Sequence, residues 1–134
     1  MPTSTERQLE RLRERFEHQA QDLGRLSFLL KGSLLQRRKQ CNSPGCACHS
    51  DPTKWHGPYW QWTSKLKGKT VTRVLTEGQV RRYRAWMDNA RRFEAIVREL
   101  HAISTRADQL LRAQERPAPQ LRGRASSGLS RSQA

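Results

Sequence analysis

Three cysteines and one histidine form the group of residues in this chain that is best suited to chemistry. Cys41, Cys46 and Cys48 are followed by His56 in the spacing C-x4-C-x-C-x7-H. Three thiolates and an imidazole are a donor set that zinc binds tetrahedrally. His49 is a competing fourth ligand. The pattern lacks the paired C-x2-C knuckles of a zinc ribbon, so it predicts a structural zinc site and leaves other interpretations open.

Two other kinds of chemistry are weighed against zinc. Three reduced cysteines in an electropositive loop are prone to oxidation, which makes a thiol redox sensor the second interpretation. A Cys–His nucleophile is the third, although one cysteine would suffice for it. Asp51 is the single acid between residues 31 and 75, so hydrolysis by paired carboxylates or two metal ions is excluded within this stretch. The protein is expected not to be an enzyme.

The basic charge of the chain is concentrated around the cysteines. The net charge is +14, and residues 31–75 hold nine Lys or Arg against one acid. This asymmetry predicts a polyanionic partner, nucleic acid before an anionic membrane, although high charge also favours solubility. The expected nucleic-acid-binding residues are cations for phosphates and two aromatics for stacking on bases: Arg37, Arg38, Lys39, Lys54, Lys65, Lys67, Lys69 and Arg73, with Trp55 and Tyr59.

Two helices are expected to position this stretch. A coiled-coil seam from Leu9 to Leu30 predicts one helix over residues 5–31, with Gly32 as its stop. Thr76 and Gln79 form a capping-box pattern, which predicts a second helix over residues 77–115. Two apolar stripes separated by a compact insert are expected to pair as an antiparallel helical hairpin.

The insert, residues 32–75, is expected to be a cysteine loop with a β-hairpin. Residues 33–40 fit either a short basic strand or more helix, and a strand is favoured. Residues 59–66 alternate as a strand does and 69–75 are rich in β-branched side chains, with Lys67-Gly68 as the turn. A two-residue turn pairs Arg73 with Trp62, whereas a three-residue loop shifts that pairing by one position.

The remaining expectations concern domain limits and location. Residues 1–116 are expected to form one domain, and the Pro, Gly, Ser and Arg-rich residues 117–134 a disordered basic tail. No apolar run is long enough to span a membrane, and the polar start of the chain lacks a secretory signal. Three clustered cysteines fit a reducing compartment, so a cytoplasmic location is expected.

The motif string as a whole resembles a small bacterial domain family of unknown function. It comprises Gly32-Ser33, C-x4-C-x-C, the run from His56 to Trp60 (His-Gly-Pro-Tyr-Trp) and the G-K-T-x-T-R run from Gly68 to Arg73. Many members carry Gly and Lys after the first cysteine, where this chain has Asn42 and Ser43. The resemblance covers about residues 28–100 and implies a cysteine module followed by a helix. Some members occur near mobile elements, but the family has no assigned activity.

The sequence therefore predicts an α+β protein in which a long antiparallel helical hairpin clasps a small module made of a cysteine loop and a β-hairpin. The predicted function is a non-enzymatic nucleic-acid-binding protein with structural zinc, accessory to a mobile element. A coiled-coil scaffold that binds a second copy or another protein through its helices is the alternative, and a thiol redox sensor is a further one.

Overall fold

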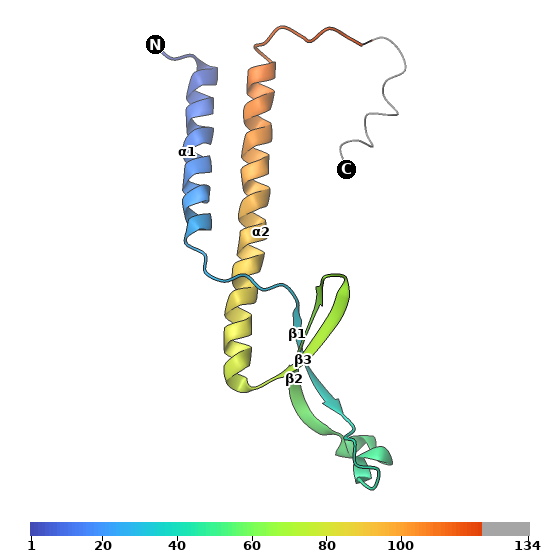
Figure 1. The fold of residues 1–134 in the computed structure, drawn as a ribbon. Coiled ribbons are helices and arrows are strands. Elements are labelled where there is room, and N and C mark those ends of the chain that lie inside the picture. Colours follow the sequence, from blue (N-terminus) through green and yellow to red (C-terminus); the bar gives the residue numbers. More distant parts are fainter. Residues whose placement is uncertain (122–134) are drawn as a thin grey trace.

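The computed structural model describes residues 1–121 and has two helices and one antiparallel sheet (Figure 1). The elements are α1 (Ser4–Gly24), β1 (Ser33–Lys39), β2 (His56–Leu66), β3 (Lys69–Leu75) and α2 (Glu77–Arg112), with two short 3-10 turns between β1 and β2. The fold is therefore α+β, as predicted. No helix among these residues is long and apolar enough to cross a membrane.

The three strands form a sheet in the order β1-β2-β3. The favoured strand over residues 33–40 is confirmed, because β1 pairs antiparallel with β2. Of the two hairpin registers, the structure has the one in which Trp62 faces Arg73. Lys67 and Gly68 both have positive φ, 52° and 79°, as a two-residue hairpin turn requires.

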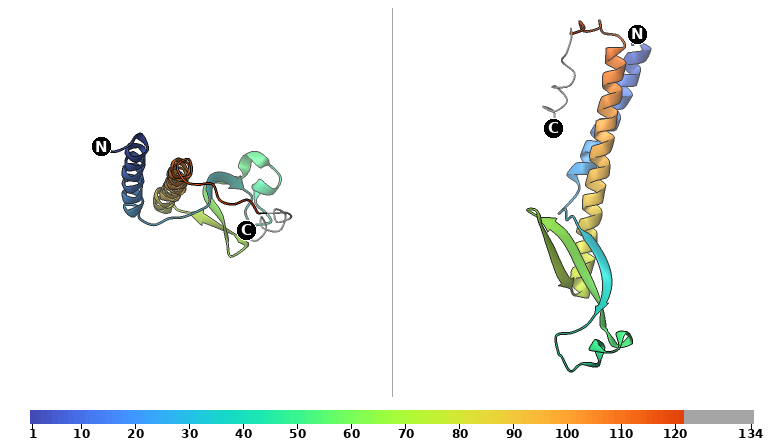
Figure 2. Two further views of the ribbon diagram at one scale, coloured as in Figure 1. Left: turned by 90° about the horizontal axis from the view of Figure 1, so that it is seen from above. Right: turned by 90° about the vertical axis from the view of Figure 1, so that its right-hand side faces the viewer.

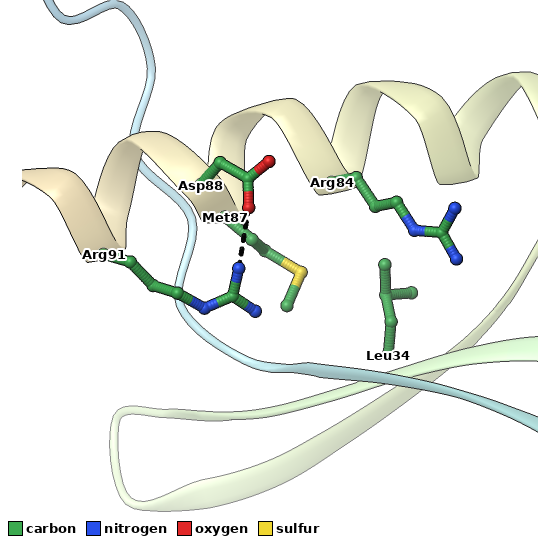
Figure 3. Close-up of a pocket in the computed structure, with 5 residues that line it drawn as sticks. All are labelled: Leu34, Arg84, Met87, Asp88 and Arg91. Carbon is green, nitrogen blue, oxygen red and sulfur yellow. Dashed lines mark hydrogen bonds and ion pairs between the residues drawn. The ribbon is translucent and has the colours of Figure 1, made fainter.

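The core lies where the sheet meets the first half of α2. Trp62 and Leu75 from the sheet pack on Val80, Tyr83 and Met87 from the helix. The rings of Trp62 and Tyr83 meet edge to face, with centroids 5.4 Å apart. Leu34 of β1 and Met87 meet beside this core at a notch of about 230 Å³ that Arg84, Asp88 and Arg91 flank, and Arg91 is paired with Asp88 at 2.7 Å (Figure 3).

Both α1 and the sheet pack against the long helix α2. The sheet lies along its first half, and α1 runs antiparallel to it along its second half, so α2 separates α1 from the sheet (Figures 1 and 2). The expected clasp of the module between two helices does not form, because α1 ends before it reaches the level of the sheet. The cysteine loop lies at the end of the sheet farthest from α1 (Figure 1).

The predicted first helix, residues 5–31, is seven residues too long. It ends at Gly24, and residues 25–32 cross α2 without regular structure. Asn89 of α2 donates hydrogen bonds to Ser27 and to the carbonyl of Phe28, and the ring of Phe28 lies 5.0 Å from that of Trp86. These contacts outweigh the helical propensity of the segment.

The second helix agrees closely with its prediction. Thr76 and Gln79 form the reciprocal capping box, and the helix starts at Glu77. It ends at Arg112, three residues before the predicted limit. Of the predicted basic tail, residues 117–121 have no helix or strand, and residues 122–134 lie outside the described residues.

Candidate metal centre and basic surface

Both ends of the cysteine loop bring ligands to one point. Cys41 follows the end of β1, Cys46 and Cys48 lie at the first 3-10 turn, and His56 is the first residue of β2. Pairing of Lys39 with His56 holds the two strand ends together. The loop between them therefore returns Cys46 and Cys48 to the strands that carry the other two ligands.

The four potential ligand atoms form a compact group. The three cysteine sulfurs and a ring nitrogen of His56 all lie within 4.8 Å of one another. Cys41 Sγ is 3.6 Å from Cys48 Sγ, and Cys46 Sγ is 3.3 Å from His56 Nε2. Tetrahedral zinc sets sulfur atoms about 3.8 Å apart and sulfur and nitrogen about 3.6 Å apart, given its usual bond lengths. The group is therefore spaced closely enough to hold a metal ion and is compatible with zinc.

The surroundings of the group suit thiolate ligands. The backbone N–H of Cys41 donates to Cys48 Sγ at 3.4 Å, and the side-chain amide of Gln40 donates to the carbonyl of Cys48. Such outer contacts orient metal ligands. Cys48 is the buried member of the group, and Cys41 and Cys46 are half-buried. No carboxylate belongs to the group, so the donor set favours zinc over harder cations.

Hydrogen bonds within and beside the ligand group shift the pKa values of Cys41, Cys46 and His56. A backbone hydrogen bond at Ser43 lowers the pKa of Cys41 to about 6. A backbone hydrogen bond at Cys48, followed by the contact with His56, lowers the pKa of Cys46. The same contact with Cys46 is the main reason that the pKa of His56 is raised.

Cys48 differs from the other two cysteines. The backbone hydrogen bond from Cys41 lowers its pKa, but burial and the neighbouring thiols outweigh that effect, so the pKa is raised. A bound dication would favour the deprotonated form of every member.

The structure distinguishes the two candidate histidines. His56 belongs to the ligand group, whereas His49 does not and is exposed on the 3-10 turn. Gly57 and Pro58, which follow His56, lie within β2. Gly57 has a φ of +120°, and a Cβ there would lie 2.9 Å from the carbonyl oxygen of Arg37, so the strand pairing beside His56 requires glycine.

The predicted cations do not converge on one site. Arg37, Arg38, Lys39 and Lys54 lie at the cysteine-loop end of the sheet, whereas Lys65, Lys67 and Lys69 lie at the hairpin turn. Lys65 lies six positions after Tyr59 along β2, which is about 20 Å at the rise of a β-strand. The two groups are therefore separate basic surfaces at opposite ends of β2.

Two arginines of the predicted set have partners within the protein, and Trp55 is half-buried. Arg73 lies over the Trp62 ring and donates to the hydroxyl of Tyr83 at 3.1 Å. Arg38 donates to the backbone carbonyl of Trp55 at 2.7 Å. Trp55 is half-buried with an enclosed indole nitrogen, and is thus less accessible to a base than exposed Tyr59.

Sequence reasoning missed the arginines of α2 that stack on aromatic rings. The guanidinium of Arg84 lies 4.5 Å from the ring centre of Trp60, and that of Arg82 lies 5.5 Å from that of Trp86. The only available signal was the dense run of arginine and aromatic residues from Arg81 to Trp86. The contact of Arg84 with Trp60 places further positive charge beside the sheet.

Of three comparisons with known proteins, one gave a match. Neither the curated proteins nor the solved structures gave a match. A family model described as a domain of unknown function, DUF6788, matches residues 6–85. The match starts earlier and ends earlier than the resemblance over residues 28–100. It includes most of α1, the whole sheet and the start of α2. Since it spans more than half of the sequence, the chain belongs to the DUF6788 family of domains of unknown function.

Proposed function

We propose that this protein is a non-enzymatic nucleic-acid-binding protein whose cysteine loop is held by zinc. One observation carries the proposal: the ligand group and the exposed side chains of Arg37, Lys39 and Lys54 belong to the same loop and strand ends. The metal would thus fix the positions of cations that meet phosphates. The loop's single acid, Asp51, accepts hydrogen bonds from the backbone and hydroxyl of Thr53 and does not offset these cations by pairing.

Tyr59 is the aromatic best placed to contact a base. It is exposed and faces Arg37 across the strand pair, and the ammonium group of Lys39 lies 5.6 Å from its ring centre. A stacking ring beside cations is the usual arrangement of single-strand binding surfaces. The cysteine-loop end of the sheet is therefore the favoured contact surface, and the hairpin turn is secondary.

The zinc part of the proposal is tested by metal analysis of untagged protein. We expect about one zinc per chain, lost in Cys48→Ser and His56→Gln. The matched control is His49→Gln, which should keep its zinc because His49 is outside the ligand group. Metal-free protein with three reactive thiols would contradict the zinc site.

The nucleic-acid part is tested by binding to labelled single- and double-stranded DNA and RNA of one sequence. If six to ten phosphates are contacted, affinity should fall about 10³- to 10⁵-fold between 50 and 200 mM salt. The triple variant R37Q/K39Q/K54Q should bind more weakly and with a shallower salt dependence.

The control for this variant removes the same charge elsewhere. R11Q/R98Q/R106Q takes three arginines from the helices, far from the cysteine loop. It should bind nearly as well as the original protein. Equal loss of affinity in both variants would show that binding depends only on net charge and would contradict the assigned surface. Binding that does not change with salt would overturn the nucleic-acid proposal.

A thiol redox sensor is the second candidate, favoured by the 3.6 Å between Cys41 Sγ and Cys48 Sγ. With a peroxide as oxidant, these two thiols would form one disulfide while the peroxide is reduced to water or alcohol. A peroxide-dependent mass loss of two hydrogens in zinc-loaded protein would support this candidate. Zinc-bound thiols that resist peroxide would exclude it.

A further inference from the structure

The helical hairpin is only one layer thick, and its two faces differ. A groove of about 530 Å³ lies along one face between α1 and the last turns of α2. Its floor and walls are mostly apolar: Leu9, Leu12, Phe16, Ile103, Ala107 and Leu111. Phe16 is 38% exposed and Leu111 43%. The groove therefore leaves large apolar side chains in contact with water.

A second hollow between the same helices has a polar character. It has a volume of about 220 Å³, and Gln8, Arg11, Arg15 and Arg106 surround the apolar Leu12 and Leu110. Long cationic side chains cover apolar surface while their charged ends stay in water. Three arginines thus cover the apolar residues of this hollow, whereas Arg13 is the one cationic side chain that lines the larger apolar groove. Contiguous exposed apolar surface marks an interaction site.

The charges beside the groove indicate its occupant. Two charged residues line it, Arg13 and Glu17, one turn apart on α1. Glu17 forms no ion pair within residues 1–121, and Arg13 has only an exposed contact of 3.4 Å with Glu10. A surface that carries one charge of each sign is complementary to itself when a two-fold axis passes between them.

We propose that the apolar groove is the interface for a second copy of this chain. The two copies of α1 run antiparallel, so that Arg13 of each copy lies opposite Glu17 of the other, and the four helices form a bundle. A parallel arrangement of the two α1 helices would instead place Arg13 of one chain opposite Arg13 of the other. The inference adds a quaternary structure to the proposed function and does not depend on zinc or nucleic acid.

The position of the groove leaves the cysteine loop and sheet of each copy exposed in the proposed dimer. It reaches α2 between Ile103 and Leu111, whereas the sheet packs on Val80 to Met87. At least 16 helical residues separate the two regions, or about 24 Å. The dimer would therefore present one cysteine module at each end of the bundle.

Light scattering during size-exclusion chromatography tests the dimer on the full chain. The chain has a mass of 15.6 kDa, so a dimer doubles that value. We expect the dimer in the original protein and the monomer in F16Q/L111Q. A monomer in the original protein up to about 100 µM, or an assembly larger than a dimer, would overturn the proposal.

The matched control is L66Q/V74Q, which alters two apolar side chains of similar exposure, 44% and 50%, on the sheet. It should remain dimeric, and circular dichroism shows whether each variant keeps its helices. Dissociation of this control to the same extent as F16Q/L111Q would contradict the assignment of the interface to the groove.

A charge exchange tests the antiparallel arrangement. R13E sets two acids opposite each other at two places in the dimer, and the dissociation constant should rise about three- to thirty-fold, given the usual strength of exposed ion pairs. The double variant R13E/E17R restores opposite charges and should recover most of the affinity. Failure of the double variant to recover would overturn the antiparallel arrangement.

Discussion

Gly32 and Trp62 show how one residue without a side chain allows the core to close. Gly32 has a φ of +142°, and a Cβ at this position would lie 2.3 Å from the indole nitrogen of Trp62. Trp62 is the largest fully buried side chain among the described residues. The chain can enter β1 directly over this ring because position 32 carries only hydrogen.

We predict that Gly32→Ala lowers the free energy of unfolding by roughly 2–4 kcal/mol. The left-handed backbone accounts for about 1–2 kcal/mol, and displacement of Trp62 supplies the rest. Urea denaturation followed by tryptophan fluorescence measures the change. Gly24→Ala is the control, because a Cβ there meets nothing within 4 Å. It should be neutral or stabilise by up to about 1 kcal/mol, and a G32A variant as stable as this control would contradict the steric argument.

At the scale of elements, the segment between α1 and β1 depends on α2 for its conformation. The backbone N–H of Leu30 donates to the carbonyl of Trp86, and Leu30 packs against the core. Asn89 binds the same segment through Ser27 and Phe28. A segment whose apolar pattern predicts helix therefore crosses α2 without regular structure, because the Trp86 carbonyl and the Asn89 side chain satisfy part of its backbone.

We predict that Asn89→Ala loosens this crossing by about 1 kcal/mol, the usual net value of such hydrogen bonds. The amide hydrogen of Leu30 should exchange about fivefold faster, as measured by NMR. Asp88→Ala is the control, since its ion pair with Arg91 is largely exposed and contributes little. Unchanged exchange at Leu30 in N89A would show that the Asn89 hydrogen bonds do not stabilise the segment.

At the scale of the whole molecule, the candidate metal centre and the apolar core lie in different places. The ligand group lies at the cysteine-loop end of the sheet, where His56 pairs with Lys39, whereas the core lies between the sheet and α2. A small loop without a hydrophobic core of its own needs a cross-link such as a metal ion to stay ordered. The helices need none, because their stability comes from apolar packing.

We predict that chelation of the metal at neutral pH disorders the loop and leaves the rest folded. Hydrogen exchange should accelerate over residues 41–55, while α2 keeps its protection and the helical circular dichroism changes little. Addition of zinc should reverse the effect, since the binding free energy of such a site is largely loop-folding free energy. Loss of helical signal on chelation would show instead that the metal supports the whole domain.

The sequence by itself determined the local features of this protein. The spacing from Cys41 to His56 indicated the ligand group, the strand alternation indicated the β-hairpin, and Thr76 with Gln79 indicated the start of α2. Each of these signals acts over a few neighbouring residues, where propensity and hydrogen bonding within the segment dominate.

The tertiary structure alone decided how the elements are arranged. It ended α1 at Gly24, separated the cations into two ends of β2, and placed α2 between α1 and the sheet. Periodicity along one segment says which side chains seek burial but not which distant partner buries them. The partner depends on packing between elements, such as the contacts of Asn89 and Trp86 with the crossing segment. The energy of such contacts cannot be read from the pattern of a single segment.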